Sequence, residues 1–321
     1  MGGVGMKQHL SRFAALSGSV LALLVQVFLK NHRRHPEPSL PYFTYFLLIA
    51  AAVVLAVTVI SFFNRKVRTV LEKSGILIGA LFALLALFNI LTGKTALLPV
   101  LLFPSFDNIF SVFVESKALM FRCIVHSFRL LGLGLLWGIS IGFVTGLGIG
   151  YSRRVSFWLE PVIKVIGPVP ATAWIPFALV VFPTTFGASV FVVALAVWFP
   201  VVLLTSSGIQ NIPNAYFEVG KTLGAKPFYQ LFRIAIPAAL PNIFQGIFFG
   251  ICSAFIALMT GEMFGAKAGI GWFINMEKEL AEFKGVYAGL ILIAIFCNVV
   301  LAVLFRVRGR LLRWQKGLIK Y

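Results

Sequence analysis

The stretch EVGKTLGAKPFYQLFRIAIPAALP, residues 218–241, places charges, glycines and prolines between two long apolar runs. A helix that precedes Gly224 is predicted to stop there, because a left-handed C-terminal cap costs little only for glycine. Pro227 suits the first turn of a second helix, where the N–H group that proline lacks would have no partner anyway. Pro237 and Pro241 are predicted to end this second helix. The stretch therefore predicts two short helices that meet at a tight turn.

The composition of the whole chain defines the surroundings of this turn. Of the 321 residues, 60% are hydrophobic and only 12% are charged, and the mean hydropathy is +0.96. Soluble domains have about 45–50% apolar and about 25% charged residues. The chain is therefore predicted to be an integral membrane protein that is embedded in the lipid bilayer.

The basic residues and the cysteines exclude other classes of protein. The net charge is +18, but no basic stretch is interleaved with the aromatic residues that a single-strand binder needs. No nucleic acid partner is expected. The three cysteines, Cys123, Cys252 and Cys297, are widely spaced and lie in or beside apolar segments, so they predict no metal site and no disulfide framework.

Hydropathy predicts the membrane spans. A span needs about 20 apolar residues to cross about 30 Å of hydrocarbon. Seven segments satisfy this condition: 42–63, 75–92, 124–150, 160–181, 188–207, 241–261 and 287–306. Residues 13–29 form a marginal further span, and an alternative interpretation of them is a signal peptide.

Lys and Arg residues indicate the orientation, because cytoplasmic loops carry an excess of them. One set of connections holds 15 of these residues and the other holds six. The richer set is 64–74, 151–154, 208–240 and 306–321, and the poorer set is 93–123, 182–187 and 262–286. The opening stretch and the C-terminus are thus predicted to face the cytoplasm. Residues 13–29 must then cross as well, which gives eight spans. This topology places Lys30, Arg33 and Arg34 on the external side, which disagrees with the excess of Lys and Arg expected in cytoplasmic loops.

The opening stretch resembles a signature of the permease subunits of binding-protein-dependent ABC importers. That signature runs Glu-Ala-Ala, three residues, Gly, nine residues, Ile, one residue, then Leu-Pro. These spacings are matched by Glu218, Gly224, Ile234, Ile236 and Pro237. The Ala pair is replaced by Val219 and Gly220, and the Leu is replaced by Ile236.

Three further segments, 126–154, 167–183 and 260–272, resemble the nitrate, sulfonate and taurine branch of that family. The resemblance covers roughly residues 75–310. It implies an all-α, polytopic type I ABC importer permease fold with a six-span core and one or two extra N-terminal spans. The implied domains are an extension, 1–63, and a permease domain, 64–321.

The resemblance also implies the site and the partners. Coupling helices at about 212–237 would contact ATPase subunits through Glu218, Val219, Gly220, Gly224, Ala225, Lys226 and Pro237. The implied system has two ATPase subunits, which bind ATP and Mg²⁺, and an external solute-binding protein that selects a small solute. It lies in a bacterial inner membrane. The chain itself would bind no cofactor or metal.

The motifs that are absent agree with a transport role. The sequence contains no G-x-x-x-x-G-K-[ST], so ATP must be hydrolysed by another subunit. It also lacks a nucleophile elbow and an H-E-x-x-H motif, so it is not expected to be an enzyme. The alternative is a self-contained secondary transporter or channel, which normally carries ionisable residues at mid-membrane. The scarcity of such residues favours the permease.

The number of coupling motifs predicts the stoichiometry. ABC ATPases work as a pair about a two-fold axis, and this chain holds one copy of the motif. A second permease chain is therefore required. It is either a second copy of this chain, which gives a homodimer, or a paralogous permease.

Glycines and prolines mark two of the spans. Gly134, Gly138, Gly142, Gly146 and Gly150 recur at every fourth residue, which lines one helix face for close packing or for sliding during gating. Prolines at 161, 168, 170, 176 and 183 are predicted to break the span 160–181. Broken backbone at membrane depth is tolerated only in protein or beside a cavity. Pro168, Pro170, Trp174 and Pro176 are therefore the candidate translocation path.

Four polar residues lie near the outer ends of the spans. Arg122, His126 and Arg129 share one helix face and are interpreted either as snorkelling side chains or as groups that attract anions. Glu262 is interpreted either as a solvated or capping carboxylate or, by the resemblance, as part of an external gate.

Overall fold

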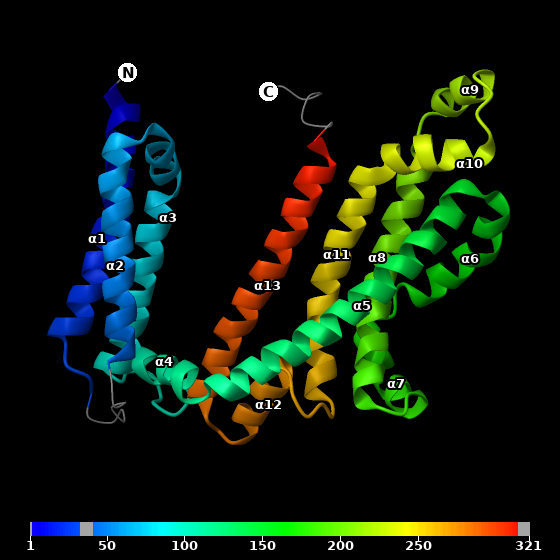
Figure 1. Cartoon of the computed structure of the whole chain (residues 1–321). Helices are drawn as coiled ribbons and strands as arrows, with labels where there is room; N and C mark the ends of the chain where they lie inside the picture. Colours follow the sequence, from blue (N-terminus) through cyan, green and yellow to red (C-terminus); the bar gives the residue numbers. More distant parts are fainter. Residues whose placement is uncertain (1, 33–40, 314–321) are drawn as a thin grey trace. The chain divides into compact units, whose positions relative to one another are not determined.

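The computed structural model describes residues 2–32 and 41–313. Within these ranges all regular structure is helical and no strand is present, which confirms the all-α prediction (Figure 1). The chain divides into two compact units. The first contains Met1–Lys117 and Glu277–Ala288, and the second contains Ala118–Met276 and Gly289–Tyr321.

The first unit is built on three long helices. Its elements are α1 (Gly2–Phe28), α2 (Tyr42–Phe63), α3 (Arg65–Asn89), the π-helical turn η1 (Ile90–Lys94) and α4 (Phe106–Glu115). Helices α1 and α3 run side by side in the same direction (Figure 1). Small residues allow this approach: a methyl group on Gly18 would lie 2.6 Å from the carbonyl oxygen of Gly79. Such contacts replace the hydrophobic driving force that is missing between helices in lipid.

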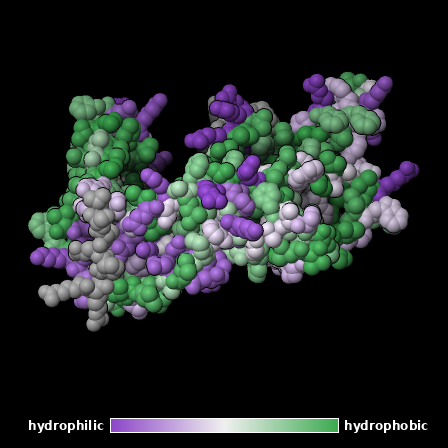
Figure 2. All heavy atoms as spheres, turned by 60° about the horizontal axis from the view of Figure 1, so that its bottom comes forward, coloured by the Kyte–Doolittle hydropathy of each residue, from purple (hydrophilic) through white to green (hydrophobic). Residues whose placement is uncertain are grey.

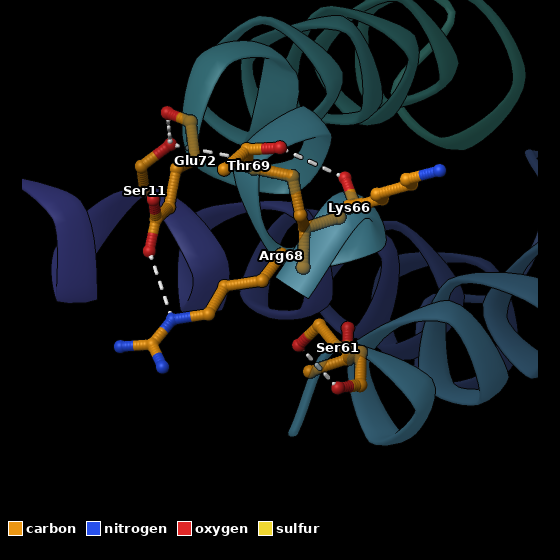
Figure 3. Close-up of polar contacts among 8 residues, drawn as sticks. Ser11, Ser61, Lys66, Arg68, Thr69 and Glu72 are labelled. Carbon is orange, nitrogen blue, oxygen red and sulfur yellow. Dashed lines mark hydrogen bonds and ion pairs between the residues drawn. The ribbon is translucent and has the colours of Figure 1, made fainter. Parts of the chain in front are cut away.

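Polar contacts fix both ends of this bundle. Near the α2–α3 turn, the Ser11 hydroxyl donates to the carbonyl of Glu72 at 2.7 Å, and Arg68 pairs with the Glu72 carboxylate at 3.3 Å (Figure 3). At the other end, the buried carboxylate of Asp107 accepts from the backbone N–H of Phe43 at 3.0 Å and from Gln26 at 2.9 Å. These bonds join α1, α2, α3 and α4.

The second unit contains the remaining helices, of which α12 and α13 extend across the division between the units. They are α5 (Lys117–Tyr151), α6 (Arg153–Ile166), the 3₁₀ turn η2 (Ala171–Trp174), α7 (Ile175–Val181), α8 (Thr185–Gln210), α9 (Asn214–Thr222), α10 (Pro227–Gln230), the π-helical turn η3 (Leu231–Ala235), α11 (Ile236–Met263), α12 (Ile270–Glu279) and α13 (Phe283–Leu311).

Helix α8 is the centre of the second unit. Its partner α11 runs antiparallel to it, with Gly246 and Gly250 against the backbone of Val201 and Val197. The glycines at 134, 138, 142, 146 and 150 place α5 on another face of α8. They oppose a row that also repeats every fourth residue: Val193, Val197, Val201, Thr205 and Ile209. A methyl group on Gly146 would lie 2.7 Å from the Cβ atom of Thr205, so only glycine permits this approach.

Six of the seven predicted apolar spans lie on helices, and the span 160–181 is interrupted between Ile166 and Ala171. Six helical segments are long and apolar enough to cross a membrane: Tyr42–Phe63, Arg65–Lys94, Lys117–Tyr151, Thr185–Gln210, Pro227–Met263 and Phe283–Leu311. A seventh candidate is a pair bent by 88°, Arg153–Ile166 and Ala171–Val181. In α1 the apolar part is shorter, Phe13–Phe28, so the count of eight spans stays a prediction. Hydrophobic residues cover much of the face shown in Figure 2.

Two predictions about prolines are wrong. Pro237 and Pro241 do not end the second helix of the opening stretch, because the helix continues from Pro227 to Met263. Pro161 lies inside α6 and does not break it. The predicted division into an extension, 1–63, and a permease domain, 64–321, stays a prediction; in the structure α3 packs with α1 and α2 in the first compact unit. Arg33 and Arg34 lie outside the described residues.

Candidate functional site

Helices α9 and α10 form a knuckle, residues 214–230, at one end of the α8–α11 pair (Figure 1). The turn between them depends on Gly224, whose φ angle is +76°. The N–H group of Ala225 donates to the carbonyl of Gly220 and that of Gly224 donates to Lys221, both at 2.9 Å. This pair of bonds is a Schellman cap, which satisfies the last carbonyls of α9. Pro227 then occupies the first turn of α10.

Further contacts hold the knuckle to the helices beneath it. The buried side chain of Gln230 donates to the carbonyl of Ala225 at 2.9 Å. The hydroxyl of Tyr151, the last residue of α5, donates to the carbonyl of Pro227 at 2.9 Å. Gly220 is buried, and a methyl group there would lie 2.9 Å from the Cδ1 atom of Ile234. The knuckle is therefore rigidly attached to α5 and to the helix that leads into α11.

The knuckle exposes large apolar side chains. Leu223 is 82% exposed and Phe228 is 78% exposed. A hollow of about 590 Å³ between the two helices is lined by Tyr216, Val219, Gly220, Leu223, Gly224, Ala225, Lys226, Tyr229 and Ile234. Exposed apolar patches of this kind mark protein interaction sites. Glu218 and Lys226 are exposed beside the patch and add charges to this surface.

The helix that leaves the knuckle is continuous over 37 residues, from Pro227 to Met263. The π-helical turn η3 lies within it, and the N–H group of Ile236 donates to the carbonyl of Leu231, five residues earlier. Pro237 follows this wide turn and lines a groove of about 770 Å³ together with Arg233 and Asn242. The knuckle and α11 are therefore joined by continuous helical backbone.

The second candidate region is the broken span. Helix α6 ends at Ile166, and the chain bends by 88° before η2 and α7 continue it. Pro168 and Pro170 lie exposed at the break, Trp174 is half-buried, and Pro176 is in the first turn of α7. Gly167 meets the ring of Phe199 on α8, which a methyl group would overlap. The structure thus brings Gly167 and Pro170 of the break against α8.

A cavity of about 250 Å³ opens at this break. Sequence reasoning missed most of its walls, because α8 and α11 supply them from far along the chain. The lining residues are Ile166, Gly167, Val169, Pro170, Ala171, Thr172, Leu195, Ala196, Phe199, Pro200, Ser253 and Ile256. For α8 the sequence did contain one indication of a cavity, because Pro200 lies inside an apolar helix.

Glu262 is not a solvated carboxylate, because the residue is fully buried. It accepts a hydrogen bond from Ser127 of α5 at 2.6 Å and one from the backbone N–H of Gly271 at 2.8 Å. The Nδ1 atom of His126 lies 3.5 Å from the same carboxylate. Gly269 has a φ angle of +131°, and a methyl group there would overlap the carboxylate. Glu262, on α11, therefore bonds to α5 and to the first turn of α12.

Arg122, His126 and Arg129 line one groove of about 730 Å³. The two arginines are exposed, and the ring of His126 packs edge-on against Phe186 with 5.4 Å between centroids. Among the described residues no group of three or more His, Cys, Asp or Glu side chains is placed to hold a metal ion.

The family described as the binding-protein-dependent transport system inner membrane component matches residues 135–314, more than half of the chain. The chain therefore belongs to this family. The putative aliphatic sulfonates transport permease protein SsuC of Bacillus subtilis is 29% identical over 185 residues, 58% of this chain and 67% of that protein. The nitrate import permease protein NrtB of Synechococcus elongatus is 31% identical over 177 residues, 55% of this chain and 62% of that protein. The chain spans about two thirds of the length of these relatives.

A solved structure supports the fold. A chain of the MetNI methionine ABC transporter, in an inward-facing conformation, matches with a TM-score of 0.53 and 16% identity, over 61% of this chain and 98% of that chain. The predicted resemblance to ABC importer permeases of the nitrate and sulfonate branch is confirmed. The chain is thus a transport component of the membrane, not a self-contained secondary transporter or channel.

Proposed function

We propose that this chain forms the translocation path for a small anionic or zwitterionic solute and couples it to a separate ATPase. The observation that carries the proposal is the exposed apolar knuckle, which continues without a break into the membrane helix α11. A partner that moves the knuckle would move α11 as a lever. The solute class is supported by the names of the relatives, which refer to sulfonates and nitrate.

The remaining partners follow from chemistry that this chain lacks. Its sequence has no P-loop, so two ATPase subunits would bind ATP and Mg²⁺ and dock on the knuckle. An external binding protein would select the solute. The knuckle carries Lys221 and Lys226, and the end of α13 carries Arg308 and Arg310, which supports a cytoplasmic position for both in a bacterial inner membrane.

Two permease copies are required for two docked ATPases. The glycine stripe of α5 is not free to form the contact between copies, because α8 of the same chain covers it. The exposed prolines of the broken span, Pro168 and Pro170, are the better candidates for the two-fold axis. A mass measurement of the purified complex separates a homodimer from a pair with a paralogous permease.

We also propose that α1 crosses the membrane, which gives eight spans. Helix α1 lies parallel to α3 from Ser11, which bonds to α3 at Glu72, to Gln26, which accepts from Asn89. A helix that follows a membrane span over this length crosses with it. A cysteine at position 3 should therefore be protected from a reagent added outside. Labelling by that external reagent would contradict the eighth span.

The test of the coupling role is retention of an ATPase. The chain is purified from its own host in mild detergent, and a P-loop ATPase is sought by mass spectrometry. Leu223→Glu should abolish its co-purification, because it places a charge in the apolar patch. Glu218→Ala should reduce it to a smaller extent. The matched control is Leu280→Glu, which changes a leucine that is 64% exposed outside the knuckle.

Two outcomes would contradict the proposal. One is full retention of the ATPase by Leu223→Glu. The other is solute uptake into liposomes by the purified chain alone, which is the behaviour of a secondary transporter.

A further inference from the structure

We propose that the groove lined by Arg122, His126 and Arg129 on α5 binds an anionic phospholipid. This arginine groove has a volume of about 730 Å³. Its other walls are Phe121, Val125, Leu133, Phe186 and Ala268. The groove lies at the end of α5 where Ser127 bonds to Glu262 in the last turn of α11, whereas the knuckle leads into the first turn of α11 (Figure 1). Lipid binding there does not depend on the coupling role of the knuckle.

The two arginines of the groove carry unpaired charges. Arg122 and Arg129 are exposed, and within the described part of the chain neither makes a hydrogen bond or an ion pair. No Asp or Glu occurs among the residues that line the groove. The carboxylate of Glu262 lies 3.5 Å from the Nδ1 atom of His126, but it is fully buried and already accepts two hydrogen bonds. The arginines are therefore available to a phosphate group, which guanidinium binds through two parallel N–H bonds.

The spacing of the basic residues suits one ligand that lies along α5. Positions seven residues apart are two helical turns and about 10.5 Å apart along the axis, and they point to nearly the same side. His126 lies between the two arginines on this face. Lys267 is exposed beside Ala268 and adds positive charge near the groove. The groove therefore presents positive charge along its whole length.

The apolar walls favour a lipid over a soluble anion. Phe121 is 66% exposed and Leu133 is 40% exposed, and both line the groove together with Val125 and Phe186. Acyl chains that pack against these side chains gain dispersion contacts. Inorganic phosphate has no apolar part and gains none. The combination of unpaired arginines and exposed apolar walls fits a ligand with a charged head and hydrocarbon chains.

The length of α5 places the groove near the membrane surface. Its 35 residues extend over about 52 Å, whereas the hydrocarbon is about 30 Å thick. The last residue, Tyr151, bonds to the knuckle, so the excess length lies at the other end of α5. A span of about 20 residues counted back from Tyr151 begins near Gly132. Arg129 then lies at the headgroups and Leu133 lies in the hydrocarbon, which is the order of a phosphate and its acyl chains.

The first test measures lipid affinity by native mass spectrometry. The full-length chain, with the subunits that co-purify with it, is titrated with phosphatidylglycerol or phosphatidylcholine. Phosphatidylglycerol should bind about tenfold more tightly. Arg122→Gln with Arg129→Gln should lower its affinity about 25-fold, about fivefold for each arginine. The matched control, Arg308→Gln with Arg310→Gln, removes the same charge from exposed positions at the end of α13 and should change the affinity less than about twofold.

A second variant separates loss of the site from loss of the fold. Arg122→Lys with Arg129→Lys keeps both charges but not the paired N–H groups of guanidinium. It should therefore bind phosphatidylglycerol with an affinity between those of the wild type and the glutamine variant. The Tm of all three proteins in lipid-free detergent should be equal, because both side chains are exposed.

The second test locates the bound lipid. Cys123, Cys252 and Cys297 are replaced by alanine, and a bimane label is attached at Trp137→Cys, one turn beyond the groove on α5. Brominated phosphatidylglycerol should quench this label more than the same fraction of brominated phosphatidylcholine, and millimolar inorganic phosphate should not change the difference. Val53→Cys on α2 is the control, because its side chain has the same exposure as Trp137, 56%, and both lipids should quench it equally.

Three results would overturn the lipid site. The first is equal affinity of the wild type and the glutamine variant for phosphatidylglycerol. The second is loss of the preferential quenching when inorganic phosphate is added, which would assign the groove to a soluble anion. The third is a glutamine variant that keeps the lipid but no longer binds the external solute-binding protein in a pull-down, which would make the groove a protein interface.

Discussion

Two regions of this chain carry closely spaced prolines, and they fold in opposite ways. At Pro168 and Pro170 the helix stops and the chain bends by 88°. At Pro237 and Pro241 the helix runs on for 37 residues in total. The number of prolines is the same, so their spacing and local setting decide the outcome.

The spacing acts through the N–H groups that prolines lack, because Gly167 before Pro168 and Ile236 before Pro237 both keep the α conformation. Prolines two residues apart remove two donors from a single turn of helix. Pro237 and Pro241 are one turn apart, and the π-helical turn η3 precedes them. Because η3 already pairs N–H groups with carbonyls five residues earlier, Pro237 can enter a widened helix. The region of Pro168 and Pro170 therefore forms a cavity, and the region of Pro237 and Pro241 forms part of a continuous helix, Pro227–Met263, which is called the lever below.

The largest expected effect is removal of the break. Pro168→Ala with Pro170→Ala restores two N–H groups, and a proline inside a helix costs about 3 kcal/mol, so a straight helix gains on the order of 100-fold in population. ATP-driven uptake should fall in proportion to the fraction of molecules that become straight, and the distance between spin labels on α6 and α7 should lengthen. The control is Pro161→Ala, at a proline already inside α6, which should leave uptake unchanged. Normal uptake by the double variant would show that the bend is not required.

The next effect concerns α8, which borders both regions. Gly138→Val should destabilise the protein by about 1–3 kcal/mol, because the added side chain overlaps Val197 and the backbone of Ala194. Thermal unfolding in detergent measures this as a lower Tm. The matched control is Gly132→Val on the same helix, where nothing lies within 4 Å of the new Cβ atom. Equal Tm values for the two variants would mean that α5 and α8 are not packed closely at the glycine stripe.

Sequence reasoning succeeded where one residue alone decides the conformation. Gly224 was predicted to adopt a left-handed cap and has a φ angle of +76°, because glycine is the residue that does this at little cost. The apolar spans were found because lipid imposes a minimum length. The continuity at Pro237, the burial of Glu262 and the contribution of Ser253 to the cavity were missed. Each depends on atoms from distant segments or on a helix irregularity that has no local signature.

A smaller effect is expected where glycine, not proline, interrupts the helix. Gly224→Ala should cost about 1–2 kcal/mol, because space is open around the new methyl group and the strain lies only in the backbone. The strained knuckle should lower the amount of solute transported per ATP hydrolysed, with the spans still folded. Gly309→Ala in α13 is the control, since its surroundings are equally open and its φ angle is not positive. An unchanged amount of solute transported per ATP in Gly224→Ala would show that the knuckle does not couple ATP hydrolysis to transport.

The smallest effect is expected at the prolines of the lever. Pro241→Ala restores an N–H group one turn after Pro237, within a helix that is already continuous, so it adds a backbone hydrogen bond without changing the path of the chain. Uptake should stay within about twofold of the wild type, and Tm should rise slightly, since alanine is the better helix former. Pro237→Ala should be less neutral, because the turn η3 immediately precedes it. A loss of uptake in Pro241→Ala as large as that in the double variant at 168 and 170 would mean that α11 bends during transport. The contrast between a broken span and a rigid lever would then be wrong.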